Sequence, residues 1–293
     1  MATGGEAWPV RALAWRKVSG DERQAAEAFL KAREKFCVAA CARFIAAGTK
    51  AGKREHVWYL CDSGGGLSSL LINSRNSLFP VFGTNSAIPC PGFLKRFLLK
   101  VPIHLVQGFL KDVETLELLM EDRGYFAAER IDYDLMGLDT APRTDAFKEG
   151  PSGLVIRAPL AGDKVRLFKL HSAYEKEEVL PKNAVFNPAY CRYSLERILS
   201  SKRVLVAELD GQVVGKINTN AVSFTSYQIG GVYVCPEFRS LGIATRMIAV
   251  FSADLLAQGK GIVLFCKKHN KAAQKAYLKA GFSVFSDYRI SYF

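Results

Sequence analysis

The chain has 293 residues, a net charge of +12, 49% hydrophobic residues and seven cysteines. This length predicts two domains, and the ordinary apolar fraction excludes a disordered, collagen-like or coiled-coil protein. No apolar run reaches the ~18 residues of a membrane span, and no signal peptide is visible, so we expect a cytoplasmic protein without a membrane partner.

The first half of the chain predicts helices and a hairpin. Apolar residues recur at helical spacing from Asp21 to Ala47. Two strand-like runs, Val57–Cys61 and Leu67–Asn73, follow around a glycine-rich turn. Residues Lys111–Asp122 predict another amphipathic helix, and Tyr125–Leu135 alternates like a strand. We therefore expect a smaller α/β lobe over residues 1–145.

The second half, residues 146–293, predicts an α/β domain with a mixed sheet. It follows a linker-like stretch, Gly137–Gly153, that is rich in Asp, Thr, Pro and Gly. The expected strands are Leu154–Pro159, Val204–Leu209, Val213–Asn218, Tyr227–Val234, Ile262–Cys266 and a final strand. One expected helix starts at Asp163. The other three span Pro188–Ser200, Leu241–Ala257 and Lys271–Ala280.

Cysteine and histidine spacing predicts no metal site. The cysteines are scattered and never spaced Cys-x-x-Cys, and the four histidines are isolated from one another. Cys37 and Cys41 lie four residues apart in an apolar helical pattern, which predicts buried free thiols.

One segment has the features of an anion-binding site. A predicted strand, Tyr227–Val234, is followed by Pro236. A turn that carries Arg239, Gly242 and Ala244 then leads into a long helix. The first-turn N–H groups of a helix lack intrahelical partners, and the helix dipole adds positive charge there. Small residues let a diphosphate approach these groups, and an arginine adds fixed charge.

The spacing Arg-x-x-Gly-x-Ala, after a strand that ends Val-Tyr-Val-x-Pro, resembles motif A of the GNAT acetyltransferases. The resemblance continues through Asn270, Tyr277, Gly281 and Phe282, which match the family's Asn-x-x-Ala-x-x-x-Tyr-x-x-x-Gly-Phe element. It covers the chain from about Leu154 to the C-terminus. It implies acetyl-CoA as donor and direct acetyl transfer to an acceptor, usually an amine.

The resemblance assigns CoA contacts residue by residue. Val232 and Val234 match the strand whose backbone pairs with the pantetheine, and Asn270 and Tyr277 match a second CoA-contacting element. The diphosphate loop corresponds to Arg239, Leu241, Gly242, Ile243, Ala244 and Thr245. Tyr277 is the candidate general acid for the departing thiolate, with packing on a buried helix face as the alternative.

The general base is less well marked in the sequence. The strand Tyr227–Val234 carries no acidic residue, which excludes a carboxylate there. Glu178 is the first choice as base, a water relay is the second, and Glu177 and Glu237 are further candidates. Acids in such positions are more often solvated surface residues than catalytic bases.

The basic segment Gly259–Ala280 has six lysines and no acid. We expect Lys267, Lys268, Lys271 and Lys275 to flank the CoA entrance, where a 3′-phosphate adds charge. Nucleic-acid binding would interleave stacking aromatics, so it is not favoured as the partner. Two alternatives stay open: a non-catalytic acyl-CoA-binding regulatory protein, and a basic RNA-binding module with an inherited GNAT fold.

The two halves share a weak echo, because Gly124-Tyr125 and Gly281-Phe282 each follow a helix and precede an alternating strand. This makes a degenerate second GNAT-like lobe plausible in the first half. No Arg-x-x-Gly-x-Ala turn occurs from Phe82 to Lys100, where Pro89, Pro91 and Gly92 stand instead. Because proline has no N–H to offer an anion, we expect no donor-binding loop in this half.

Overall fold

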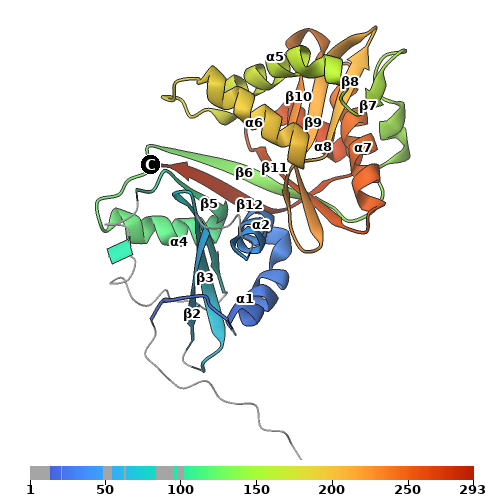
Figure 1. Ribbon diagram of the computed structural model, residues 1–293. Coiled ribbons are helices and arrows are strands. Elements are labelled where there is room, and N and C mark those ends of the chain that lie inside the picture. Colours follow the sequence, from blue (N-terminus) through green and yellow to red (C-terminus); the bar gives the residue numbers. More distant parts are fainter. Residues whose placement is uncertain (1–13, 21, 49–54, 63, 84–95, 98–101) are drawn as a thin grey trace, which may run out of the picture. The chain divides into compact units, whose positions relative to one another are not determined.

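The computed structural model describes residues 14–20, 22–48, 55–62, 64–83, 96–97 and 102–293. The chain forms two compact units (Figure 1). One contains the chain up to Asp132 together with Asp287–Phe293, and the other contains Tyr133–Ser286. The predicted division has a single boundary, after residue 145, whereas the chain passes between these two units twice, after Asp132 and after Ser286. That division into domains stays a prediction.

The first unit is a sheet with helices on its faces. Its strand order is β1-β2-β3-β4-β5-β12. The strands are β1 (Arg16–Lys17), β2 (Glu55–Cys61), β3 (Leu67–Ser74), β4 (Ser77–Phe82), β5 (Leu105–Phe109) and β12 (Ser283–Tyr292, in this unit from Asp287). The helices are α1 (Glu22–Lys31), α2 (Val38–Ala47) and α4 (Leu110–Glu121). Strand β12 pairs with β5 through Tyr288–Tyr292, antiparallel.

Two expectations for this unit need correction. The single helix expected from Asp21 to Ala47 is two helices, because the chain forms a 3₁₀ turn at Glu34–Phe36 and Cys37 leaves helical geometry at φ −141°. Strands β4 and β5 were missed, in part because Pro80 breaks the strand pattern of β4. The prediction for Cys37 and Cys41 is confirmed, since both are buried free thiols.

The second unit has a mixed sheet, which confirms the α/β class expected for this half. Its strand order is β6-β11-β10-β9-β8-β7, with β10 and β11 parallel and the other pairs whose registers are resolved antiparallel. The strands are β6 (Glu129–Leu138, in this unit from Tyr133), β7 (Val155–Arg157), β8 (Val204–Leu209), β9 (Gln212–Val222), β10 (Ser226–Val234) and β11 (Gly261–Lys267). The helices are α5 (Lys164–Tyr174), α6 (Pro188–Ser201), α7 (Ile243–Leu256) and α8 (Lys271–Ala280), and a π-helical turn, Glu175–Val179, extends α5.

Side-chain alternation places two helical layers on this sheet (Figure 1). On one face, leucines of α5 and α6 pack with Val206, Val213 and Tyr233. On the other face, α7 packs with Ile217 and Ile229. Most element bounds agree with the sequence within a few residues, because the helices have an apolar face and the strands are rich in apolar residues.

Strands β10 and β11 separate after a short pairing, and this positions the site. They pair only through Ser226–Gln228 on β10. Further along, β10 shifts register against β9 between Gly230 and Tyr233, and Gly231 takes a positive φ of 61°. The result is a β-bulge beside the opening between the two strands.

Candidate functional site

A cavity of about 470 Å³ opens at the N-terminus of α7. Of the residues predicted to contact CoA, only Leu241 does not line it, because this side chain is 48% exposed to solvent. Glu178, the first-choice base, lines the cavity as well. The structure thus brings together residues from β10, the loop before α7 and the start of α8.

Gly242 shapes the anion-binding end of the cavity. It is the residue before α7 and takes a left-handed conformation at φ +81°. A Cβ at this position would lie 2.7 Å from Glu149 Oε2 and 2.9 Å from the backbone nitrogen of Gly150. The first intrahelical bond runs from Arg246 N–H to the Gly242 carbonyl at 3.1 Å. The N–H groups of the three preceding residues therefore have no intrahelical carbonyl, and an anion fits there.

Arg239 is held at the mouth of this site by a carboxylate. Its Nε donates to the Val234 carbonyl at 3.1 Å, and its Nη2 donates to Glu177 Oε2 at 2.8 Å. The same Glu177 oxygen accepts a hydrogen bond from the Tyr233 hydroxyl at 3.0 Å. The Arg239 guanidinium holds the pKa of Glu177 below its usual range, so Glu177 is a weak proton acceptor.

Glu178 is also engaged by donors. Its Oε1 accepts from Asn270 Nδ2 at 3.1 Å, and its Oε2 lies 3.2 Å from Lys267 Nζ. Asn270 has a second role, because its Oδ1 accepts from Ala273 N–H and caps α8. Both oxygens of Glu178 thus have partners in this state of the protein.

Tyr277 lies on the buried face of α8 and lines the cavity at 7% exposure. Burial raises the pKa of its hydroxyl well above the usual value, so the group stays protonated. Its ring meets Phe282 edge-on at 5.9 Å, but its hydroxyl has no hydrogen-bond partner among the residues that the structure describes. A proton donor facing the cavity is available at this position.

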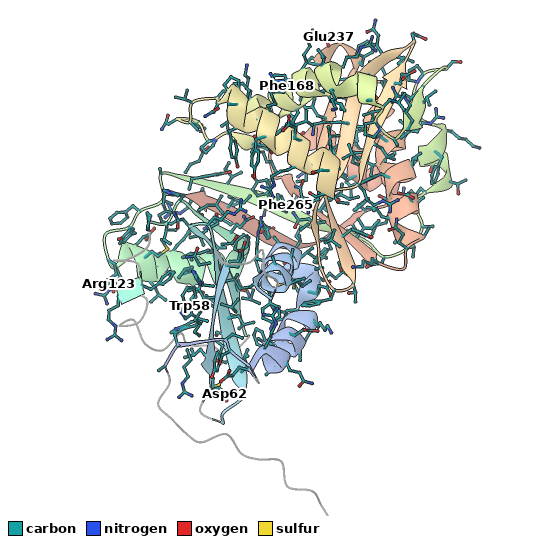
Figure 2. All side chains as sticks on the ribbon, viewed as in Figure 1. Trp58, Asp62, Arg123, Phe168, Glu237 and Phe265 are labelled. Carbon is teal, nitrogen blue, oxygen red and sulfur yellow. The ribbon has the colours of Figure 1, made fainter. Side chains whose placement is uncertain are left out.

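The remaining candidates differ in whether they reach the cavity. Glu237 is exposed on the turn after β10 and does not line the cavity (Figure 2). Of the lysines expected at the CoA entrance, Lys275 lines the cavity, whereas Lys271 opens on a neighbouring hollow that also contains Arg143. Lys279, which was not singled out, lines the cavity and pairs with Glu149 at 2.6 Å.

Three features of the site escaped the sequence analysis. Glu149 comes from the stretch interpreted as linker, so no local pattern marked it. The bulge in β10 has a visible signal in hindsight, because two consecutive glycines, Gly230 and Gly231, interrupt the strand. Lys216 is the third, and it lies buried beside that bulge.

Neither a metal site nor a membrane span is found in the described ranges. Across those residues, no three His, Cys, Asp or Glu side chains come close enough to hold a metal ion. The helices described there are also too short or too polar to cross a membrane.

Residues 167–282 match the family model for acetyltransferases of the GNAT family. These residues form a GNAT domain. Part of the chain is 30% identical over 77 residues to N-alpha-acetyltransferase 20 of Dictyostelium discoideum, which is 26% of this chain and 44% of that protein. The match thus spans less than half of the relative's length.

Two solved structures resemble nearly the whole chain in fold. A Drosophila protein is 13% identical, with a TM-score of 0.66 over 96% of this chain and 99% of its own. A tandem GNAT protein of the clavulanic acid biosynthesis pathway is 12% identical, with a TM-score of 0.59 over 95% and 97%. At these identities the likeness concerns the fold, and it extends beyond the GNAT domain into the first unit.

Proposed function

We propose that the GNAT domain transfers an acetyl group from acetyl-CoA directly to an amine acceptor. The observation that carries this proposal is the left-handed Gly242 at the start of α7, which opens onto a cavity walled by the bulged strand β10 and by Tyr277. The cavity has an anion site at one end, an unpaired strand edge in the middle and the Tyr277 hydroxyl beyond it. This order matches the diphosphate, the pantetheine and the thioester along acetyl-CoA.

The donor-binding roles follow from these groups. The first-turn N–H groups of α7 and the Arg239 guanidinium bind the diphosphate. The Val232 carbonyl and the Val234 N–H pair with the pantetheine amides, as an added strand would, because β11 has already diverged from β10 at this point. Asn270 and Tyr277 contact the donor from α8.

The transfer needs two proton movements. The acceptor nitrogen attacks the thioester carbonyl carbon, the C–S bond breaks, and the Tyr277 hydroxyl supplies a proton to the departing thiolate and regains one from solvent after CoA leaves. The acceptor loses its own proton to water or to Glu178. Water is the better supported route in the present geometry, because donors already occupy both oxygens of Glu178.

A second candidate function is a regulatory protein that binds acyl-CoA without turnover. The pairing of Glu177 and Glu178 with cations favours it, since neither carboxylate is free to act as a base. Turnover separates the two candidates: loss of the thioester absorbance of acetyl-CoA in a panel of amines supports the transferase. The panel includes peptide N-termini, as the name of the Dictyostelium relative suggests, together with lysine side chains and small amines.

Donor binding is tested with two matched glycine variants. Gly242→Glu puts bulk and negative charge at the diphosphate position, and we expect calorimetry to show at least a ~10-fold loss of acetyl-CoA affinity, the loss of one charge-assisted contact. Gly259→Glu is the control, because Gly259 also has a positive φ, 74°, but lies beyond the other end of α7 with open space around it. Equal affinities in both folded variants would refute the placement of the donor.

A further inference from the structure

Lys216 is a buried cation without an ion pair. It lies on β9, and only 2% of it is exposed. Its Nζ donates to the Gly231 carbonyl at 3.0 Å, lies 3.4 Å from Asn218 Oδ1, and sits 4.3 Å from the ring centre of Tyr174. No carboxylate of the described residues comes within 4.0 Å of it. A buried charge in such a place is costly, so its position calls for a physical explanation.

The surroundings of Lys216 fit an ammonium group. The three neighbours of Nζ are a carbonyl oxygen, an amide oxygen and an aromatic face. The two oxygens accept hydrogen bonds, and the aromatic face attracts positive charge. Burial lowers the pKa of Lys216 to about 7, and the carboxylate of Glu175 opposes that shift. Burial and Lys216 together lower the pKa of His171 to about 3, so this histidine is neutral.

The other titratable groups around Lys216 come from neighbouring elements. The thiol of Cys191 on α6 has a pKa raised by burial, as has the Tyr233 hydroxyl on β10. Both groups are therefore neutral near pH 7. Burial also raises the pKa of Glu175, and the Lys216 ammonium opposes that shift. Within this cluster Lys216 and Glu175 are the groups that can carry charge near pH 7.

The contact with Gly231 reaches the cavity through one peptide bond. The Gly231 carbonyl and the Val232 N–H belong to the same peptide unit, and Val232 lines the cavity. In the bulge, Gly230 pairs with Asn218 and Tyr233 with Lys216, which leaves Gly231 and Val232 without paired residues on β9. A hydrogen bond to a carbonyl oxygen polarises the peptide and makes its N–H a stronger donor.

We propose that Lys216 is a positioning residue that strengthens the Val232 N–H as the hydrogen-bond donor to the thioester carbonyl oxygen. The inference rests on the proposed acetyl transfer. When a nucleophile adds to the carbonyl carbon, the C–O π pair moves onto the oxygen, and the ammonium stabilises this oxyanion through the peptide. When the C–S bond breaks, the charge passes to the thiolate, which takes a proton. Lys216 is not itself a base here, since it does not line the cavity.

Hydrolysis of acetyl-CoA by the full chain tests this role without a known acceptor, because water then attacks the same carbonyl. Thioester absorbance gives kcat and KM across pH. We expect Lys216→Met to lower kcat ~10-fold, less than the ~10²–10³-fold typical of a direct oxyanion donor, because the effect passes through one peptide. The KM for acetyl-CoA should stay within about twofold, because the ammonium acts on the transition state rather than on donor binding.

The pH profile separates this role from a merely structural one. Since the ammonium is the active form, kcat of the wild type should fall as pH rises through about 7. Lys216→Arg should move that fall to higher pH, because a guanidinium stays charged. Glu175→Gln should move it to lower pH, because the carboxylate that favours the ammonium is gone.

The outcomes are distinguishable. Acetyl-CoA affinity and thermal unfolding of each variant report whether it is folded, and the profiles of Lys216→Arg and Glu175→Gln decide the matter if Lys216→Met does not fold. Turnover in the wild type with no shift of the profile in either variant would overturn the role of Lys216 alone. No turnover in the wild type, with hydrolysis and every amine of the panel, would overturn the proposed function and this inference with it.

Discussion

Replacing Glu177 with glutamine should tighten the binding of acetyl-CoA. Glu177 holds Arg239 at 2.8 Å, and a diphosphate would have to compete with that carboxylate. The lowered pKa of Glu177 keeps it ionised near neutral pH. Glutamine retains an oxygen that can accept from the Tyr233 hydroxyl, so the variant removes the charge and little else.

The exposure of the pair sets the size of the effect. Both side chains are 42% exposed, and exposed ion pairs are worth about 0.2–1 kcal/mol. The dissociation constant for acetyl-CoA should therefore fall by a factor of about 1.4 to 5 in Glu177→Gln. Added salt should shrink this difference, because it screens the pair.

A matched ion pair in the same unit supplies the control. Arg203 and Asp254 also lie 2.8 Å apart, each 45% exposed, and neither lines the cavity. Asp254→Asn removes the same charge and should leave acetyl-CoA affinity unchanged within calorimetric error. Weaker binding in Glu177→Gln, or an equal gain in Asp254→Asn, would show that Glu177 does not compete with the donor for Arg239.

Three further predictions concern catalysis, stability and stoichiometry. Tyr277→Phe should keep acetyl-CoA affinity and lower kcat ~10²-fold, the low end for general acid catalysis, and a rate within about twofold of wild type would leave Tyr277 a packing residue. Asp163→Asn should lower the urea-derived free energy of unfolding by about 2 kcal/mol, because Asp163 is buried and accepts two hydrogen bonds from Arg157, at 2.7 and 3.1 Å. Because Arg157 lowers the pKa of Asp163, this contribution to the free energy of unfolding is complete above the ordinary aspartate pKa of about 4. It is lost as pH falls through the lowered pKa. An Asp163→Asn variant as stable as wild type at neutral pH would contradict the prediction. Calorimetry should give one acetyl-CoA per chain, and a second site would contradict the absence of a donor loop in the first half.

Local sequence features predicted the donor end of the site. The strand leading into the loop and the glycine with positive φ before α7 are close in the chain, and the asparagine cap of α8 adjoins the helix that it caps. Their geometry depends on neighbours a few residues away, since free N–H groups are a property of any helix start. Tyr277 was predicted from its match to the Asn-x-x-Ala-x-x-x-Tyr element of the family, and it lies on the buried face of α8.

The choice of a catalytic base did not follow from sequence. Glu177 and Glu178 were candidates because they are acidic residues near the acceptor side in related proteins. Their reactivity depends on Arg239, 62 positions from Glu177, and on Asn270, 92 positions from Glu178. Such pairings form only when separate elements pack, and no spacing in the chain encodes them.

The amino-acid sequence by itself determined the α/β class of the GNAT domain and predicted a helix start with free N–H groups at Gly242, because periodicity, glycine conformation and helix capping are local. Only the tertiary structure decided that Glu149 approaches Gly242, that Lys216 is buried against the β10 bulge, and that β12 pairs with β5. A strand has hydrogen-bonding groups that any other strand can meet. Which strand it pairs with, and which charged side chains lie beside it, depend on the faces that the whole chain can bury together.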